Sequence, residues 1–134
     1  MNPKQFLTIG GIVLLLLGII GFLGILNQNT TPFFWLDTSE NIAHTVLGVV
    51  ALAAVFVPGL NKALEPFYKW IVMAVGVIAL FFGIYAFLVG SSTANFNTFG
   101  VANLESPADG ILHVVVGVWA LYAALRQPEP VKAM

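Results

Sequence analysis

Four long apolar stretches, separated by shorter polar segments, form the dominant pattern of the chain. They cover Phe6–Leu26, Ile42–Val57, Trp70–Val89 and Ile111–Leu125. A helix needs about 20 mostly apolar residues to cross the hydrocarbon core of a bilayer. The first and third stretches reach this length alone, and the second and fourth reach it together with the polar turn that precedes each. The pattern therefore predicts four membrane-spanning helices.

The composition favours a membrane protein and excludes several classes of function. Of the 134 residues, 59% are hydrophobic and 8% are charged, whereas about 25% of the residues of a soluble domain are charged. The length allows a single domain, 1–134. The chain has no cysteine, which excludes a disulfide framework and a thiolate metal site. It also contains no phosphate-binding loop, dinucleotide fingerprint or nucleophile elbow, so we expect no enzyme.

The basic residues predict the orientation in the membrane. All five lie on one side of a four-span arrangement, and they are Lys4, Lys62, Lys69, Arg126 and Lys132. Cytoplasmic segments of membrane proteins are enriched in Lys and Arg. We therefore expect both termini and a connector at 58–69 in the cytoplasm, and loops at 27–39 and 90–107 on the outer side. The basic residues form no further patch suited to nucleic acid.

The apolar stretches are also related to one another. "GIVLLLLGIIGFL" from Gly11 aligns with "GVIALFFGIYAFL" from Gly76, and Ile42–Ala54 is identical to Ile111–Ala123 at 8 of 13 positions. The alignment predicts two tandem helical hairpins, at about 6–57 and 70–125. Because both begin on the same side of the membrane, they form a parallel repeat. The expected fold is an all-α four-helix membrane bundle built from this repeat, with both termini cytoplasmic.

Glycines recur on one face of each predicted helix. Small residues let membrane helices approach closely, because apolar attraction between helices is no stronger than attraction to lipid. We therefore expect these glycines at helix contacts, and the alternative is a flat surface kept clear for a ring-shaped cofactor. The residues are Gly11, Gly18, Gly48, Gly76, Gly83 and Gly117.

Acidic residues precede the second and fourth stretches at the spacing of helix caps. "DTSE" places Asp37 at the N-cap and Glu40 at the third helical position. "SPAD" places Ser106 at the N-cap, Pro107 at the first helical position and Asp109 at the third. In a capping box each of the two side chains bonds the backbone of the other residue, and proline is favoured at the first position. Capping is therefore the simplest interpretation of these acids.

The two histidines of the chain occur in the same sequence motif, an acidic residue followed four residues later by histidine. Glu40 precedes His44, and Asp109 precedes His113. Residues four apart share a helix face, so each acid can reach its histidine. Each histidine lies about 10 Å into its helix. Polar groups at that depth of a membrane usually face the bundle interior or water.

Four interpretations of these residues remain open from the sequence. The two acid–histidine pairs could hydrogen-bond to each other across the second and fourth helices and so have a structural role. His44 and His113 could bind a tetrapyrrole, either chlorophyll or haem b. His44, His113, Glu40 and Asp109 could together hold zinc or iron. The imidazoles could also respond to pH on the outer face, since they titrate near physiological pH.

The repeated glycine-rich helix and the acid-x-x-x-His-x-x-x-Gly phrase resemble a bacterial membrane family catalogued as domain of unknown function 4383. The most specific part is "NLESPADGILHVVVGV" from Asn103, and the resemblance covers about 6–125. It implies four spanning helices and one histidine in each half, which map onto His44 and His113. It implies no activity, cofactor or substrate.

These observations together lead to an expected function. We expect a small non-enzymatic integral membrane protein that acts as an accessory or interaction subunit, for example within a larger membrane complex. Its expected surroundings are the lipid bilayer and other membrane proteins or a second copy of itself, with no nucleic acid. The expected location is the bacterial cytoplasmic membrane. Tetrapyrrole or metal binding through His44 and His113, and an outer-face response to pH, are the alternatives.

Overall fold

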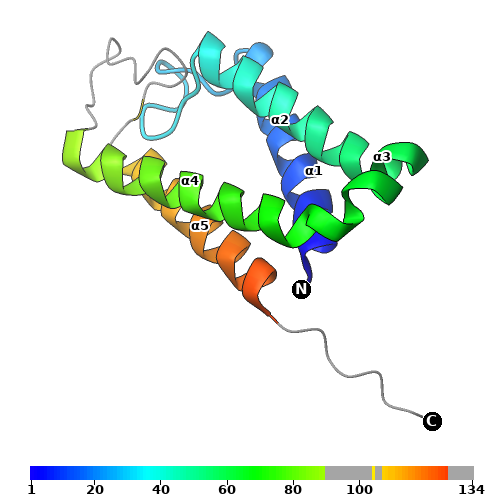
Figure 1. The fold of residues 1–134 in the computed structure, drawn as a ribbon. Coiled ribbons are helices and arrows are strands. Elements are labelled where there is room, and N and C mark those ends of the chain that lie inside the picture. The colour runs from blue at the N-terminus through cyan, green and yellow to red at the C-terminus, as the bar shows by residue number, and fades with distance from the viewer. Residues whose placement is uncertain (90–103, 105–106, 127–134) are drawn as a thin grey trace.

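The computed structural model describes residues 1–89, 104 and 107–126. In this part of the chain every regular element is a helix and no strand occurs (Figure 1). The elements are α1 (Pro3–Phe22), α2 (Thr38–Phe56), α3 (Pro58–Leu64), the 3₁₀ helix η1 (Glu65–Phe67), α4 (Tyr68–Val89) and α5 (Ala108–Leu125). The predicted all-α class is therefore confirmed.

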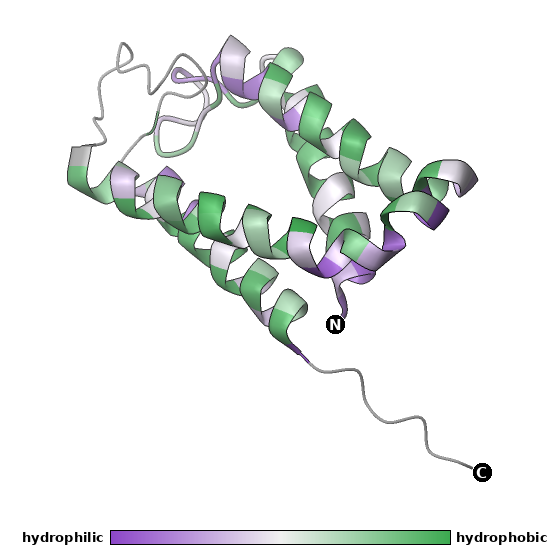
Figure 2. Ribbon diagram, in the orientation of Figure 1, coloured by the Kyte–Doolittle hydropathy of each residue, from purple (hydrophilic) through white to green (hydrophobic). Residues whose placement is uncertain are grey.

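In the described part of the chain, four helical segments are long and apolar enough to cross a membrane, as the sequence predicts. They are Pro3–Phe22, Thr38–Phe56, Pro58–Leu88 and Ala108–Leu125. A bilayer core offers no water to backbone N–H and C=O groups, so helices that satisfy these groups internally are the expected solution. Figure 2 shows hydrophobic residues along all four segments. These segments indicate a multi-pass membrane protein.

The predicted connector between the second and third spans is itself helical. α2 ends at Phe56, and α3 begins at Pro58 directly after it. Proline has no backbone N–H and restricts the residue before it, so it ends one helix and suits the first position of the next. α3 and η1 then lead into α4 without a further loop. The polar connector is thus a short helical corner.

The helices associate as two pairs. Most contacts between helices occur within the first helix pair (α1 and α2) and within the second helix pair (α4 and α5). Figure 1 shows the two pairs converging where α1 starts, α3 turns and α4 begins, and this end is called the connector end. The opposite end, where α2 and α5 begin, is called the loop end.

A compact apolar core joins the two helix pairs at the connector end. On α1, the ring of Phe6 packs edge-on against Trp119 of α5, with ring centroids 4.6 Å apart. The α1 residues of this core belong to the first helical turns, and the α5 residues belong to the last ones. Its buried members are Phe6, Leu7, Ala54, Val55, Tyr68, Val72, Ala120, Ala123 and Ala124.

Candidate functional site

The acidic residues before α2 form a reciprocal helix cap. The backbone N–H of Glu40 donates to Asp37 Oδ1 at 2.8 Å, and the backbone N–H of Asp37 donates to Glu40 Oε2 at 2.7 Å. Both hydrogen bonds of the predicted capping box are therefore present. Glu40 is only 4% exposed. One of its carboxylate oxygens is committed to the start of the helix.

The start of α5 differs from the prediction by one residue. The N-cap is Pro107 and the first helical residue is Ala108, so Asp109 is the second helical residue instead of the third. Pro107 has no side-chain acceptor, and no side-chain cap hydrogen bond forms there. Ser106, the predicted N-cap, lies outside the described residues. Asp109 is 3% exposed, so a second carboxyl group is buried at the loop end.

His113 is held by the backbone of its own helix. Its Nδ1 lies 2.8 Å from the carbonyl oxygen of Asp109, the residue that the sequence pairs with it. A carbonyl oxygen only accepts, so Nδ1 carries a proton, and Nε2 is the ring nitrogen left for another partner. The imidazole lies beside the ring of Phe82 on α4, with centroids 6.0 Å apart.

His44 belongs to a cluster of buried polar atoms on α2. Three buried side-chain atoms of the described chain lack a hydrogen bond of good geometry: Asn41 Oδ1, Thr45 Oγ1 and His44 Nδ1, the last of which still interacts with the backbone of Glu40. Their spacing of three and four residues places them on one helix face. Buried polar atoms are nearly always hydrogen-bonded, because leaving one unpaired costs about 1–3 kcal/mol. This cluster, called the α2 polar face, was not singled out by the sequence except at His44.

Two members of the α2 polar face are covered by glycines of α1. A Cβ added to Gly18 would overlap Thr45 Oγ1, and a Cβ added to Gly21 would overlap Asn41 Oδ1. The side chains of Thr45 and Asn41 therefore fill space that a larger residue at Gly18 or Gly21 would occupy. The sequence signal that was missed is Gly21, three residues after Gly18 and on nearly the same face.

All six glycines predicted to pack lie at contacts between helices. A Cβ on Gly48 would lie 2.6 Å from the backbone nitrogen of Leu15, and a Cβ on Gly117 would lie 2.9 Å from that of Leu80. The remaining glycines meet α2 or α5 in the same way, and they are Gly11, Gly18, Gly76 and Gly83. Because the partner helix of each pair covers these glycines, they provide no open flat surface for a ring-shaped cofactor.

The four predicted metal ligands are not assembled into one site. All four are described, yet no group of three or more His, Cys, Asp or Glu residues that could hold a metal ion occurs in the described part of the chain. His44 belongs to α2 and His113 to α5. The helices that carry them, α2 and α5, each pack mainly on their own hairpin partner. The four side chains do not converge because α2 and α5 belong to different helix pairs, and because one carboxylate oxygen of Glu40 is used in the cap of α2.

Comparison of the chain with family models, with curated proteins and with solved structures gives no match. The resemblance to the family catalogued as domain of unknown function 4383 therefore stays a prediction. The proposals below depend only on the residues and contacts of this chain.

Proposed function

We propose that this protein is a non-enzymatic accessory or interaction subunit that binds other membrane proteins through its apolar helix faces. The observation that carries the proposal is the small share of each span that the molecule covers by itself. Between 28% and 39% of each candidate span is buried inside the molecule. Most of every span is therefore available to lipid or to a partner helix.

The exposed faces are apolar on both helix pairs. Leu16 and Val50 on the first pair, and Ile84 and Val115 on the second, are each more than half exposed. The glycine contacts close each pair on its inner side, so these outer faces are left for other partners.

Site-specific photocrosslinking tests this proposal. A photoreactive amino acid replaces Val50 or Val115 at the exposed faces, and replaces Ala54 or Ala120 at buried positions as the matched control. The protein is irradiated in its native membrane, extracted with a membrane-solubilising copolymer and analysed by mass spectrometry. We expect a discrete protein adduct from one exposed face and none from the buried positions. Lipid adducts alone at every exposed position would contradict the proposal.

We also propose that the chain is a duplicated hairpin. The support is that contacts between α1 and α2 have counterparts between α4 and α5 at the residues that the sequence alignment pairs. The matched contacts are Gly18–Thr45 with Gly83–Val114, Gly48–Leu15 with Gly117–Leu80, and Gly11–Leu52 with Gly76–Leu121. Duplication of one hairpin explains why glycines at corresponding positions form the helix contacts in both pairs.

The proposed orientation has both termini and the α3 corner in the cytoplasm of a bacterium. The support is that all basic residues of the sequence fall in the segments assigned to the cytoplasm, where Lys and Arg are enriched. Because the chain has no cysteine, single cysteines report the orientation without background. In intact cells a membrane-impermeant maleimide should label Asn29→Cys in the outer loop, and should label Ala63→Cys on α3 only after permeabilisation. The opposite labelling would reverse the orientation.

One observation favours a second function, the binding of a tetrapyrrole or metal ion through an imidazole. The carbonyl of Asp109 holds His113 Nδ1 at 2.8 Å, which leaves Nε2 as the ligating atom, the arrangement common in histidines that bind metals. His44, at the corresponding position of α2, is the second candidate ligand. A bound tetrapyrrole would give the gently solubilised protein a visible absorption band that His113→Ala removes. Elemental analysis tests for zinc or iron in the same samples.

A further inference from the structure

Two shallow grooves meet at the connector end, around the start of α1. The first groove lies between α1 and the η1–α4 corner, and Lys4, Glu65 and Lys69 provide its charged lining. The second lies between α1 and the end of α2, and its lining includes Thr8, Ile9, Val55 and Phe56. Asn2 and Lys4 line both grooves. The polar and the apolar groove are therefore neighbours that share the Lys4 side chain.

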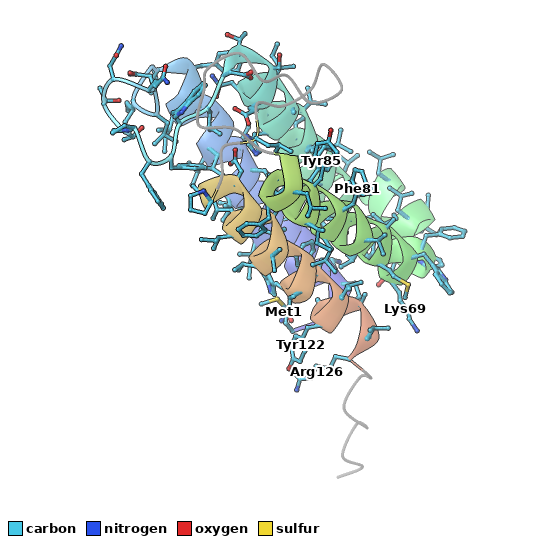
Figure 3. All side chains as sticks on the ribbon, turned by 90° about the vertical axis from the view of Figure 1, so that its left-hand side faces the viewer. Met1, Lys69, Phe81, Tyr85, Tyr122 and Arg126 are labelled. Carbon is cyan, nitrogen blue, oxygen red and sulfur yellow. The ribbon has the colours of Figure 1, made fainter. Side chains whose placement is uncertain are left out.

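The charged groove carries an excess of positive charge. Lys4 and Lys69 contribute two positive charges and Glu65 contributes one negative charge, so the lining has one positive charge in excess. Figure 3 shows Lys69 at the same end of the molecule as Arg126. Lysines at the end of membrane spans attract the phosphate groups of anionic lipids. The charge of this groove is therefore complementary to a phosphate.

Tyr68 fixes one wall of the charged groove. Its hydroxyl donates to the carbonyl oxygen of Ala54 at 2.6 Å and lies 2.8 Å from Asn61 Oδ1. The side chain is only 4% exposed. These contacts attach the start of α4 to the end of α2, so Lys69 is presented beside α1 from a rigid corner.

Three exposed aromatic residues lie in or next to the segments that line the two grooves. Phe56, Phe67 and Trp70 are each more than half exposed, and the Lys69 ammonium lies 5.8 Å from the centre of the Trp70 indole. Aromatic side chains with lysines are typical of the boundary between lipid and water. The charged groove thus lies at the connector end of the spans. In the apolar groove, Ile9 lies in the second turn of α1, and Phe56 is the last residue of α2.

We propose that an anionic phospholipid binds at the connector end, with its phosphate between Lys4 and Lys69 and one acyl chain in the apolar groove beside Ile9 and Phe56. The shared lining of Lys4 connects a phosphate site to an apolar groove, and a phospholipid has both parts in one molecule. A free phosphate ion would leave the apolar groove unexplained. The inference rests on the proposed membrane location and is independent of any protein partner.

Lipid binding is measured on the purified full-length protein in phosphatidylcholine nanodiscs that contain increasing amounts of phosphatidylglycerol. Native mass spectrometry counts bound phosphatidylglycerol, and the unfolding temperature reports its effect on stability. Lys4→Gln and Lys69→Gln should each weaken binding by about fivefold, as expected for one lysine near an anionic surface. Glu65→Gln should strengthen binding. Lys62→Gln is the matched control, because Lys62 is an exposed lysine of α3 that lines neither groove.

A second pair of variants tests the acyl chain. Ile9→Trp fills the apolar groove, and Ile12→Trp places the same side chain at a similarly exposed position of α1 outside it. Ile9→Trp should weaken phosphatidylglycerol binding and Ile12→Trp should leave it unchanged, with both variants unfolding as the wild type does in pure phosphatidylcholine.

The proposal is overturned if Lys62→Gln weakens binding as much as Lys69→Gln, or if Ile9→Trp has no effect. It is also overturned if inorganic phosphate raises the unfolding temperature as much as the lipid does. None of these measurements involves a protein partner, so failure here is distinct from failure of the accessory-subunit proposal.

Discussion

Gly48 of α2 lies directly against the backbone of Leu15 on α1. A Cβ on Gly48 would be 2.6 Å from the Leu15 nitrogen and 2.9 Å from the carbonyl oxygen of Gly11. Real Cβ atoms do not approach backbone atoms so closely, and a backbone cannot rotate away as a side chain can. Association of membrane helices depends on close packing and weak Cα–H···O contacts. This contact therefore sets the spacing of the first helix pair.

Substituting Gly48 tests that spacing. Gly48→Ala should destabilise the protein by about 1–3 kcal/mol, because the added methyl group forces the two backbones apart. The measurement is the free energy of unfolding in mixed micelles with increasing denaturing detergent. Gly10→Ala is the control, since a Cβ there meets only the ring of Phe6 at 3.9 Å. Alanine also favours helix over glycine, so the control should be neutral or stabilising. Equal loss in both variants would refute the packing role of Gly48.

The buried hydroxyl of Thr45 gives a second prediction. Its oxygen is buried and completes no hydrogen bond within the described residues, and at the corresponding contact with Gly83 the second pair has Val114. Thr45→Val should therefore be neutral or should stabilise the protein by up to about 1 kcal/mol, because it removes an unpaired polar atom.

Thr8→Val is the matched control for Thr45→Val. The Thr8 hydroxyl donates to the carbonyl oxygen of Lys4 at 2.9 Å, so its removal should cost stability by up to about 1 kcal/mol. Both variants are measured by the same detergent titration. A marked loss for Thr45→Val would mean that a water molecule or another group pairs with this hydroxyl.

The third prediction concerns the corner that Tyr68 holds. Tyr68→Phe removes the 2.6 Å hydrogen bond to the Ala54 carbonyl oxygen and should lower the free energy of unfolding by about 1 kcal/mol. It should also loosen the α3–η1 corner, which hydrogen exchange would report as faster exchange at 58–67. Tyr122→Phe is the control, because that side chain is 55% exposed. If the two variants behave alike, the Tyr68 hydroxyl does not stabilise the corner.

The cap of α2 gives the fourth prediction. Asp37→Ala removes the acceptor for the Glu40 backbone N–H, which lies at 2.8 Å, and should cost about 1 kcal/mol. Asp37→Asn keeps an acceptor and should cost much less, because α1 already uses Asn2 in an equivalent box with Gln5. The thermal unfolding temperature of the three proteins provides the comparison. A large loss in Asp37→Asn would show that the charge matters more than the hydrogen bond.

The features of this protein that depend on local physics follow from the sequence alone. Apolar stretches long enough to span a bilayer specify four helices, because only internally hydrogen-bonded backbone is stable in lipid. The Asp37–Glu40 cap involves residues three apart, and such hydrogen bonds form wherever the helix starts. Pro58 marks the end of α2 for an equally local reason, its missing N–H.

The tertiary structure alone decided which helix faces meet and what the polar side chains contact. Lipid is as apolar as a helix surface, so hydropathy does not distinguish a residue that faces lipid from one that faces another helix. The burial of Asn41 and Thr45 against Gly18 and Gly21 follows from the pairing of α1 with α2. For the same reason the predicted four-ligand metal site is not assembled, since the helices pair within each hairpin and His113 turns to the carbonyl of its own helix.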